Sequence, residues 1–256
     1  LLAGLYEQEG PGFVRRLRGA FALALWDRAR QRLLLAVDQF GIKRLYYRAS
    51  PQAVAFASRA SALTDGPLGP TRVDPAAVYQ YLNFACVPAP GSPFADIRRL
   101  PPGHTLVAGN GPLQLHAYWY MAYPERRSRR PEAASLMYER TQDAVAHTLR
   151  GLPPKECGAF LSGGTDSSTV LGLMTRLTGE RINAFSIGFQ EERYNELSYA
   201  ELAARHFGAA HYTKIITPDE ALDLLPRLID AYDEPFGNSS ALGTFFCAQL
   251  ARQCGV

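Results

Sequence analysis

Two different patterns of hydrophobic and polar positions divide the chain into halves. In the first half, short apolar or alternating runs predict strands at Phe21–Trp26, Arg32–Asp38, Ala53–Ala57, His104–Ala108 and Leu113–His116. One helix is predicted over residues 76–84, because Asp74 suits an N-cap and Pro75 suits the first helical position. Asp38 and Gly41 occupy the first and fourth positions of a predicted type I turn. We therefore expect the first half to be mainly β-structure.

From Pro131 onward, strands and helices alternate. Apolar runs predict strands at Gly158–Leu161, Ile182–Phe189 and His211–Ile216, and helices are predicted at Glu132–Leu149, Ser168–Leu177, Leu197–Phe207, Asp219–Tyr232 and Leu242–Gln253. This alternation is typical of an α/β fold with a parallel, doubly wound sheet. We therefore expect two domains, one over residues 1–122 with a connecting segment and one over residues 131–256.

Composition limits which partners and which cellular compartment we expect for the protein. The 256 residues are 47% hydrophobic and 20% charged, and the net charge of +3 gives no reason to expect nucleic acid or an acidic membrane as a partner. No clean apolar run approaches the ~20 residues of a membrane span. The four cysteines form no Cys-x-x-Cys pair, which is typical of reduced thiols in a cytoplasmic protein. A basic cluster is interpreted as a solvated linker; it consists of Arg126, Arg127, Arg129 and Arg130.

The most informative segment joins an apolar strand to a helix and reads Ser162-Gly163-Gly164-Thr165-Asp166-Ser167. Two glycines let the backbone approach a ligand closely, and free N–H groups at a helix start attract an anion. Hydroxyls of Ser162 and Ser167 can donate to phosphate oxygens. Asp166 would repel phosphate, but it suits the Mg²⁺ that accompanies a polyphosphate. The alternative is a plain capped turn, which would need only one of these polar residues.

No lysine follows the two glycines, so the segment is not a Walker loop. It resembles instead the pyrophosphate loop (PP-loop) of enzymes that split ATP into AMP and pyrophosphate. Ile187 and Gly188, near the end of the next strand, would lie beside the adenine, because ligands of open parallel sheets bind beyond the carboxyl ends of the strands. An ordinary buried strand explains their side chains equally well.

Further segments resemble the glutamine-hydrolysing asparagine synthetase family, in the family's own order. They are Arg18–Ala22, Asp38–Tyr47, Leu100–His104, Tyr118–Trp119, Leu161–Ser168, Phe185–Gly188 and Ala231–Phe236. The resemblance implies an α+β part of a class II glutamine amidotransferase, with the antiparallel β sandwich of an N-terminal-nucleophile (Ntn) hydrolase. A synthetase domain of the adenine nucleotide α-hydrolase (PP-loop) type would follow. Implied substrates are glutamine, aspartate and ATP with Mg²⁺, and a homodimer is compatible with the resemblance.

The resemblance also implies roles for particular residues. Backbone groups of Leu161, Ile187 and Gly188 would contact the nucleotide, and the pyrophosphate and its Mg²⁺ would be held by Ser162, Gly163, Gly164, Asp166 and Ser167, with Asp166 as the metal ligand. Asp233 and Glu234 would hold substrate or, alternatively, form an acidic turn that ends a helix. Ser239 and Ser240 are interpreted as caps of the last helix. The family's nucleophilic cysteine and its second glycine-rich loop are not among the 256 residues, so we expect no catalytic residue in them and no activity from them alone.

Three residues depart from the family's pattern: Val37 replaces an arginine, Arg44 a proline and Arg59 a residue that is often glutamate. These departures raise a question about the efficiency of the glutaminase. One rival function is a β-lactam synthetase-like cyclase with a vestigial glutaminase domain. A second rival is a nucleotide-binding module without catalysis. The five histidines show no metal-ligand spacing and are interpreted as structural.

Overall fold

The structure is a computed structural model that describes residues 1–123, 129–191, 193 and 195–256. Its contacts divide the chain into two compact units. Unit 1 consists of Leu1–Pro124 and Ile229–Gly237, and unit 2 consists of Glu125–Leu228 and Asn238–Val256. The predicted linker falls partly on residues 124–128, so Arg126 and Arg127 lie outside the described residues. The predicted division at residues 122 and 131 stays a prediction.

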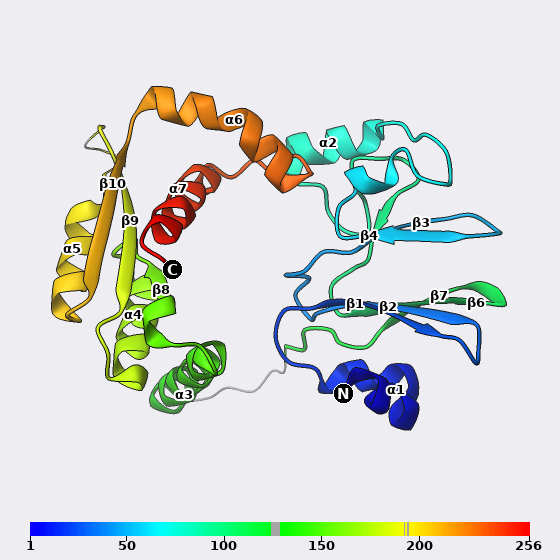
Figure 1. Ribbon diagram of the computed structural model, residues 1–256, viewed down its shortest axis with the longest axis horizontal. Coiled ribbons are helices and arrows are strands. Elements are labelled where there is room, and N and C mark those ends of the chain that lie inside the picture. The colour runs from blue at the N-terminus through cyan, green and yellow to red at the C-terminus, as the bar shows by residue number, and fades with distance from the viewer. Residues whose placement is uncertain (124–128, 192, 194) are drawn as a thin grey trace. The chain divides into compact units, whose positions relative to one another are not determined.

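Unit 1 is built on two antiparallel sheets (Figure 1). The larger has the order β1-β2-β6-β7, from Ala22–Asp27, Arg32–Val37, His104–Gly109 and Gly111–Ala117. The smaller has the order β4-β3-β5, from Val54–Ala57, Tyr46–Ala49 and Arg98–Arg99. The helices of this unit are α1 (Leu2–Glu9), α2 (Pro75–Phe84) and the 3₁₀ turns Gly10–Arg16 and Ser61–Leu63.

The continuous apolar run of β2 supplies two layers of core. Because side chains alternate along a strand, Leu34 packs with Phe13 on the face covered by α1 and the turn after it. Leu35 lies on the opposite face, in a cluster with Leu45 that Tyr47 of β3 also joins. The larger sheet is therefore covered on both faces, as Figure 1 shows.

Two local predictions in unit 1 are confirmed. Asp74 caps α2, with its carboxylate accepting from the N–H of Ala76 at 2.9 Å. The turn at Asp38 closes through the N–H of Gly41, which donates to the Asp38 carbonyl at 3.1 Å, and Gly41 has a φ of 64°. This turn places the Asp38 side chain inside the unit, where it is 1% exposed.

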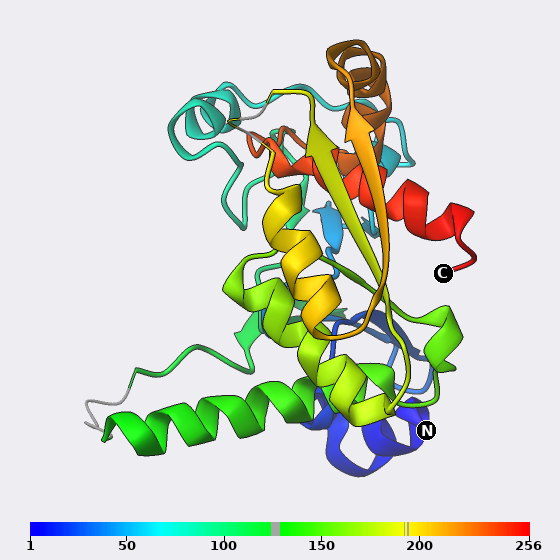
Figure 2. The same cartoon turned by 90° about the vertical axis from the view of Figure 1, so that its left-hand side faces the viewer.

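Unit 2 contains a parallel sheet of order β10-β9-β8, formed by Ala210–Ile216, Asn183–Phe189 and Gly158–Phe160. Its helices are α3 (Arg130–Leu149), α4 (Thr165–Thr178), α5 (Leu197–His206), α6 (Pro218–Tyr232) and α7 (Ser240–Gln253), with a 3₁₀ turn at Pro154–Glu156. In Figure 2, α4 and α5 lie in front of the strands and α7 lies behind them. Both faces of the parallel sheet are therefore covered by helices.

The chain combines antiparallel and parallel sheets in a mixed α/β architecture. Across β8, β9 and β10 the strands follow sequence order, so the described strands do not include the reversal that defines a doubly wound sheet. The Ntn-hydrolase and PP-loop assignments stay predictions. Among the described residues, no helix has the length and apolar character needed to span a bilayer.

Candidate nucleotide site and acidic turn

The predicted loop lies between β8 and α4 in unit 2. Strand β8 ends at Phe160, and α4 begins at Thr165, three residues earlier than the pattern predicted. Gly164 takes the N-cap position and offers no side chain as a cap. Within the described residues, the N–H groups of Thr165 and Asp166 have no acceptor, as expected for the first turn of a helix. The loop therefore presents open donors at the positive end of α4.

The serine hydroxyls hold the loop in shape. Ser167 Oγ donates to the Gly164 carbonyl at 3.2 Å, accepts from the Ser162 N–H at 3.3 Å and lies 3.0 Å from Ser162 Oγ. Ser162 Oγ in turn accepts from the N–H of Gly164 at 3.3 Å. These weak contacts are exposed, so the hydroxyls can be exchanged for contacts to a ligand.

No residue with a side chain fits at the position of Gly163. Its φ is 80°, and a Cβ at this position would lie 2.4 Å from the backbone N of Ala200 and the backbone C of Tyr199. The loop thus packs directly against the first turns of α5, and no side chain fits between them. Packing against α5, together with the positive φ, therefore accounts for glycine at this position.

A cavity of about 940 Å³ opens beside the loop in unit 2. Its wall includes the predicted residues Leu161, Ser162 and Ile187, and also Phe160, Ser186, Phe189, Glu196, Leu197, Ala200, Ser239, Ser240, Leu242, Gly243, Thr244 and Cys247. The volume and the mostly apolar wall suit the base and ribose of a nucleotide. Burial raises the pKa of the Cys247 thiol to about 11, so this side chain stays neutral in the wall.

Not every predicted residue lines that cavity. Gly163, Gly164, Asp166 and Ser167 lie in the adjoining loop and first turn rather than in the cavity wall. Gly188 is buried, and a Cβ there would lie 2.4 Å from Leu197 Cδ1, so packing accounts for this glycine. Ile187 therefore adjoins the cavity, while a nucleotide contact from Gly188 stays a prediction.

Helix α7 and the residue before it also form part of the cavity wall, which the sequence did not predict. Ser239 and Ser240 line the cavity, and Ser239 makes no side-chain cap. Ser239 occupies the N-cap position, as predicted, but Asn238 Oδ1 rather than a serine hydroxyl accepts from the Ser240 N–H, at 2.9 Å. In the sequence, two adjacent hydroxyls at the start of a helix were the signal for a possible binding role. Their place in the cavity wall follows from the fold.

A three-residue relay supports the start of the loop. Ser186 Oγ donates to the Leu161 carbonyl at 2.6 Å, and His211 Nε2 lies 2.7 Å from the same Oγ. Because the hydroxyl has a single proton, which it gives to Leu161, the Nε2–H of His211 is the donor to Ser186. Burial lowers the pKa of His211, opposed by the negative charge of Glu201.

The donor set fits a magnesium–polyphosphate ion better than a bare metal. Asp166 is exposed in the first turn of α4, and no group of three or more His, Cys, Asp or Glu side chains in the described part of the chain could hold a metal. Mg²⁺ is commonly held by one or two carboxylates together with substrate phosphates. Asp166 is therefore suited to Mg²⁺ only with phosphate oxygens as further ligands.

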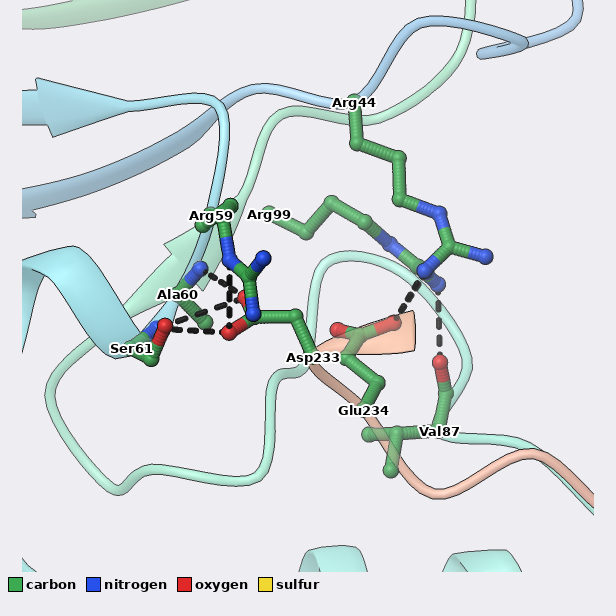
Figure 3. A network of polar contacts seen from close by, with 8 residues as sticks. All are labelled: Arg44, Arg59, Ala60, Ser61, Val87, Arg99, Asp233 and Glu234. Atoms are coloured by element: carbon green, nitrogen blue, oxygen red, sulfur yellow. Dashed lines mark hydrogen bonds and ion pairs between the residues drawn. The ribbon is translucent and has the colours of Figure 1, made fainter. Parts of the chain in front are cut away.

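The other predicted pair, Asp233 and Glu234, lies in unit 1 (Figure 3). The Glu234 carboxylate is 5% exposed, and its Oε2 pairs with Arg44 Nη1 at 3.2 Å and Arg99 Nη1 at 3.1 Å. Asp233 pairs with Arg59 at 3.4 Å. The predicted nucleotide residues, in contrast, belong to unit 2. Their predicted contact with substrate stays a prediction.

One oxygen of Glu234 remains without a hydrogen bond. Glu234 Oε1 and the Tyr46 hydroxyl are both buried, and neither has a hydrogen-bond partner among the described residues. Burial, followed by the negative charge of Glu234, raises the pKa of the Tyr46 hydroxyl. Tyr46 therefore stays protonated beside the carboxylate.

Two family models match the chain. A glutamine amidotransferase domain matches residues 1–119, and asparagine synthase matches residues 137–256. "Asparagine synthetase [glutamine-hydrolyzing] 1" of Bacillus subtilis is 28% identical over 93% of this chain and 37% of its own length. A putative asparagine synthetase of Mycobacterium tuberculosis is 32% identical over 99% of this chain and 39% of its own length. "Amidase chyE" of Penicillium rubens is 30% identical over 100% of this chain and 40% of its own length.

A comparison of structures finds a glutamine phosphoribosylpyrophosphate amidotransferase from B. subtilis, complexed with ADP and GMP. It is 15% identical, with a TM-score of 0.28, over 86% of this chain and 40% of that one. A score this low carries no argument about the fold. The class of the protein rests instead on the two sequence matches, an amidotransferase segment followed by a synthetase segment. The chain belongs to the asparagine synthetase family, and it spans about two fifths of the length of the curated relatives described above.

Proposed function

We propose that this chain forms part of a glutamine-hydrolysing asparagine synthetase, an ATP-dependent C–N ligase, and that unit 2 binds its ATP. The observation that carries the proposal is the open loop at Ser162–Ser167 beside a nucleotide-sized cavity. The names of the relatives, asparagine synthetases from bacteria, support the reaction. Aspartate, glutamine and ATP are the proposed substrates.

The chemistry explains why such a loop is useful. A carboxylate cannot expel oxide, so the aspartate oxygen attacks the α-phosphorus of ATP and pyrophosphate leaves. Ammonia released from glutamine then attacks the acyl carbon, and AMP leaves with the bonding electron pair. The N–H groups of Gly163, Thr165 and Asp166 would bind the departing pyrophosphate, where negative charge accumulates. Mg²⁺ held in part by Asp166 would supply further positive charge to the phosphates.

The recurrence of amidase names among the relatives bears on the acceptor, not on the loop. "Amidase chyE" matches over 100% of this chain, so its match includes the segment that carries the loop. We propose aspartate, and the β-lactam synthetase-like cyclase is the competing reaction. The two reactions differ in whether aspartate stimulates the exchange of pyrophosphate with ATP.

The test is ATP–pyrophosphate exchange by the full protein that carries this chain. With aspartate and Mg²⁺, Asp166→Asn should reduce exchange about a hundredfold or more, because removing one charged ligand of the phosphate-bound metal costs several kcal/mol. Asp219→Asn is the matched control, an exposed acid in the first turn of α6 of the same unit. Equal exchange in the Asp166 variant and wild type would remove Asp166 from the metal site. An exchange rate that is the same with and without aspartate would favour the cyclase.

A further inference from the structure

Among the described residues that line the cavity of unit 2, only Glu196 carries a carboxylate. We propose that Glu196 is a specificity-determining residue whose carboxylate accepts hydrogen bonds from the ribose hydroxyls of the bound nucleotide. Unit 2 would then select ribonucleotides over nucleotides that lack these hydroxyls. The inference rests on the proposed function, since it concerns the same nucleotide in the same cavity.

The Glu196 carboxylate has no structural partner in the described part of the chain. The residue is exposed at the N-cap position of α5, but its side chain makes no cap hydrogen bond and no ion pair there. Glu220 of α6 shows the contrast, because its carboxylate accepts from Lys214 Nζ at 2.7 Å and from the Thr217 N–H at 3.0 Å. Those contacts account for Glu220, whereas the Glu196 carboxylate is left open to a ligand.

The first turn of α5 reaches from the phosphate loop to the end of β9. A Cβ on Gly163 would meet the backbone of Tyr199 and Ala200, so this part of α5 packs on the loop. A Cβ on Gly188 would meet the side chain of Leu197, so the start of α5 packs on the end of β9 (Figure 2). With the phosphates at the loop and the base at the end of β9, the ribose of a nucleotide would lie along this turn, beside the N-cap carboxylate.

The charge of Glu196 determines which part of a nucleotide it can contact. An ionised carboxylate accepts hydrogen bonds but donates none, and it repels the phosphate groups. The ribose offers two adjacent hydroxyl donors, and an acidic side chain binds such a hydroxyl in dinucleotide-binding sheets. Hydrogen bonds to a charged group are stronger than neutral ones. A nucleotide without the hydroxyls would leave the carboxylate unpaired in a mostly apolar wall and would therefore bind less tightly.

The test is titration of the full protein that carries this chain with ATP and with 2′,3′-dideoxy-ATP, both with Mg²⁺. We expect wild type to bind ATP about ten- to hundredfold more tightly, because the dideoxy nucleotide lacks both hydroxyls. In Glu196→Ala this ratio of affinities should fall to about one. The ratio is the readout because losing a negative charge acts equally on the phosphates of both nucleotides. Glu191→Ala, which removes an exposed acid outside the cavity wall, is the matched control and should keep the wild-type ratio.

Glu196→Gln keeps one acceptor oxygen at the same place and should give an intermediate ratio. A wild-type ratio in Glu196→Ala would overturn the ribose contact while the proposed function stands. The same ratio with a raised half-saturating concentration of aspartate in ATP–pyrophosphate exchange would also overturn it, and would assign the carboxylate to the ammonium group of the acceptor. Wild-type protein that binds neither nucleotide would overturn the proposed function and this inference with it.

Discussion

Two turns of this chain contain similar groups, but they differ in whether their backbone N–H groups have an acceptor within the chain. Each has an aspartate, a glycine with positive φ and several closely spaced backbone N–H groups. In unit 1, the buried Asp38 carboxylate accepts from the N–H groups of Phe21, Phe40, Ile42 and Lys43 at 3.0 to 3.2 Å. In unit 2, Asp166 is exposed, and the N–H groups of Thr165 and Asp166 have no acceptor in the described part of the chain.

The difference teaches how to separate a structural turn from a binding loop. A turn that supplies its own anion is satisfied and stabilises the fold, whereas a turn whose donors remain open needs an external anion. Burial would raise the pKa of Asp38, but the N–H groups of Lys43, Ile42, Phe40 and Phe21 bring that pKa below its ordinary value. The same donors in the loop at Ser162 would stabilise a phosphate.

The largest effect is expected from Gly163→Ala. The added Cβ would approach two backbone atoms of α5 at 2.4 Å, and backbone cannot move aside as a flexible side chain can. We expect unit 2 to lose about 4 kcal/mol or more of unfolding free energy and ATP affinity to fall at least about a hundredfold. Equilibrium unfolding followed by circular dichroism and titration with ATP would measure both.

Gly179→Ala is the control for that experiment. Gly179 also has positive φ, at 68°, but a Cβ there would meet nothing within 4 Å. This variant should lose only about 1 kcal/mol and bind ATP as wild type does. Similar losses in both variants would mean that backbone conformation, rather than the contact with α5, makes Gly163 necessary.

An intermediate effect is expected from Asp38→Ala, which removes the anion from the closed turn. Four backbone N–H groups would lose their acceptor, and we expect unit 1 to lose about 3 kcal/mol of unfolding free energy. Because both tryptophans, Trp26 and Trp119, belong to unit 1, their fluorescence reports the unfolding of this unit. ATP affinity should change little in the same variant. A loss of ATP affinity as large as that of Gly163→Ala would contradict the distinction between a structural turn and a binding loop.

The sign of the pH dependence follows from the lowered pKa. A carboxyl group with a lower pKa in the folded state stabilises it fully above its unfolded pKa of about 4. That contribution is lost as the pH falls through the folded value, so wild-type unit 1 should become less stable below about pH 4. Asp38→Ala should show a weaker dependence over the same range. Parallel pH profiles would show that Asp38 is not the group responsible.

Local signals in the sequence were sufficient to predict the strands of unit 2, the cap at Asp74 and the position of the loop between β8 and α4. These features depend on residues close together in the chain. The sequence could not show that residues 229–237 pack in unit 1, because that contact joins segments more than 100 residues apart. Arg44 and Arg59 illustrate the consequence. As departures from the family's pattern they seemed to weaken the glutaminase, yet in the structure they pair with Glu234 and Asp233.

The smallest effect is expected at the relay that supports the start of the open loop. Ser186→Ala leaves the Leu161 carbonyl and the His211 N–H without their shared partner, so unit 2 should lose about 1–2 kcal/mol of unfolding free energy. ATP binding should weaken with it, because Leu161 is the residue that leads into the loop and lines the cavity.

His211 provides the conservative comparison for this relay. His211→Gln keeps an N–H donor near the position of Nε2 and should stay close to wild type, whereas His211→Leu should behave like Ser186→Ala. His147→Leu, which removes an exposed histidine of α3, controls for the loss of a ring. If the Gln and Leu variants bind ATP equally well, the ring's packing rather than its hydrogen bond supports the loop. In that case the open turn would be held only by its own serines and by the contact of Gly163 with α5, whereas the closed turn would keep its internal anion.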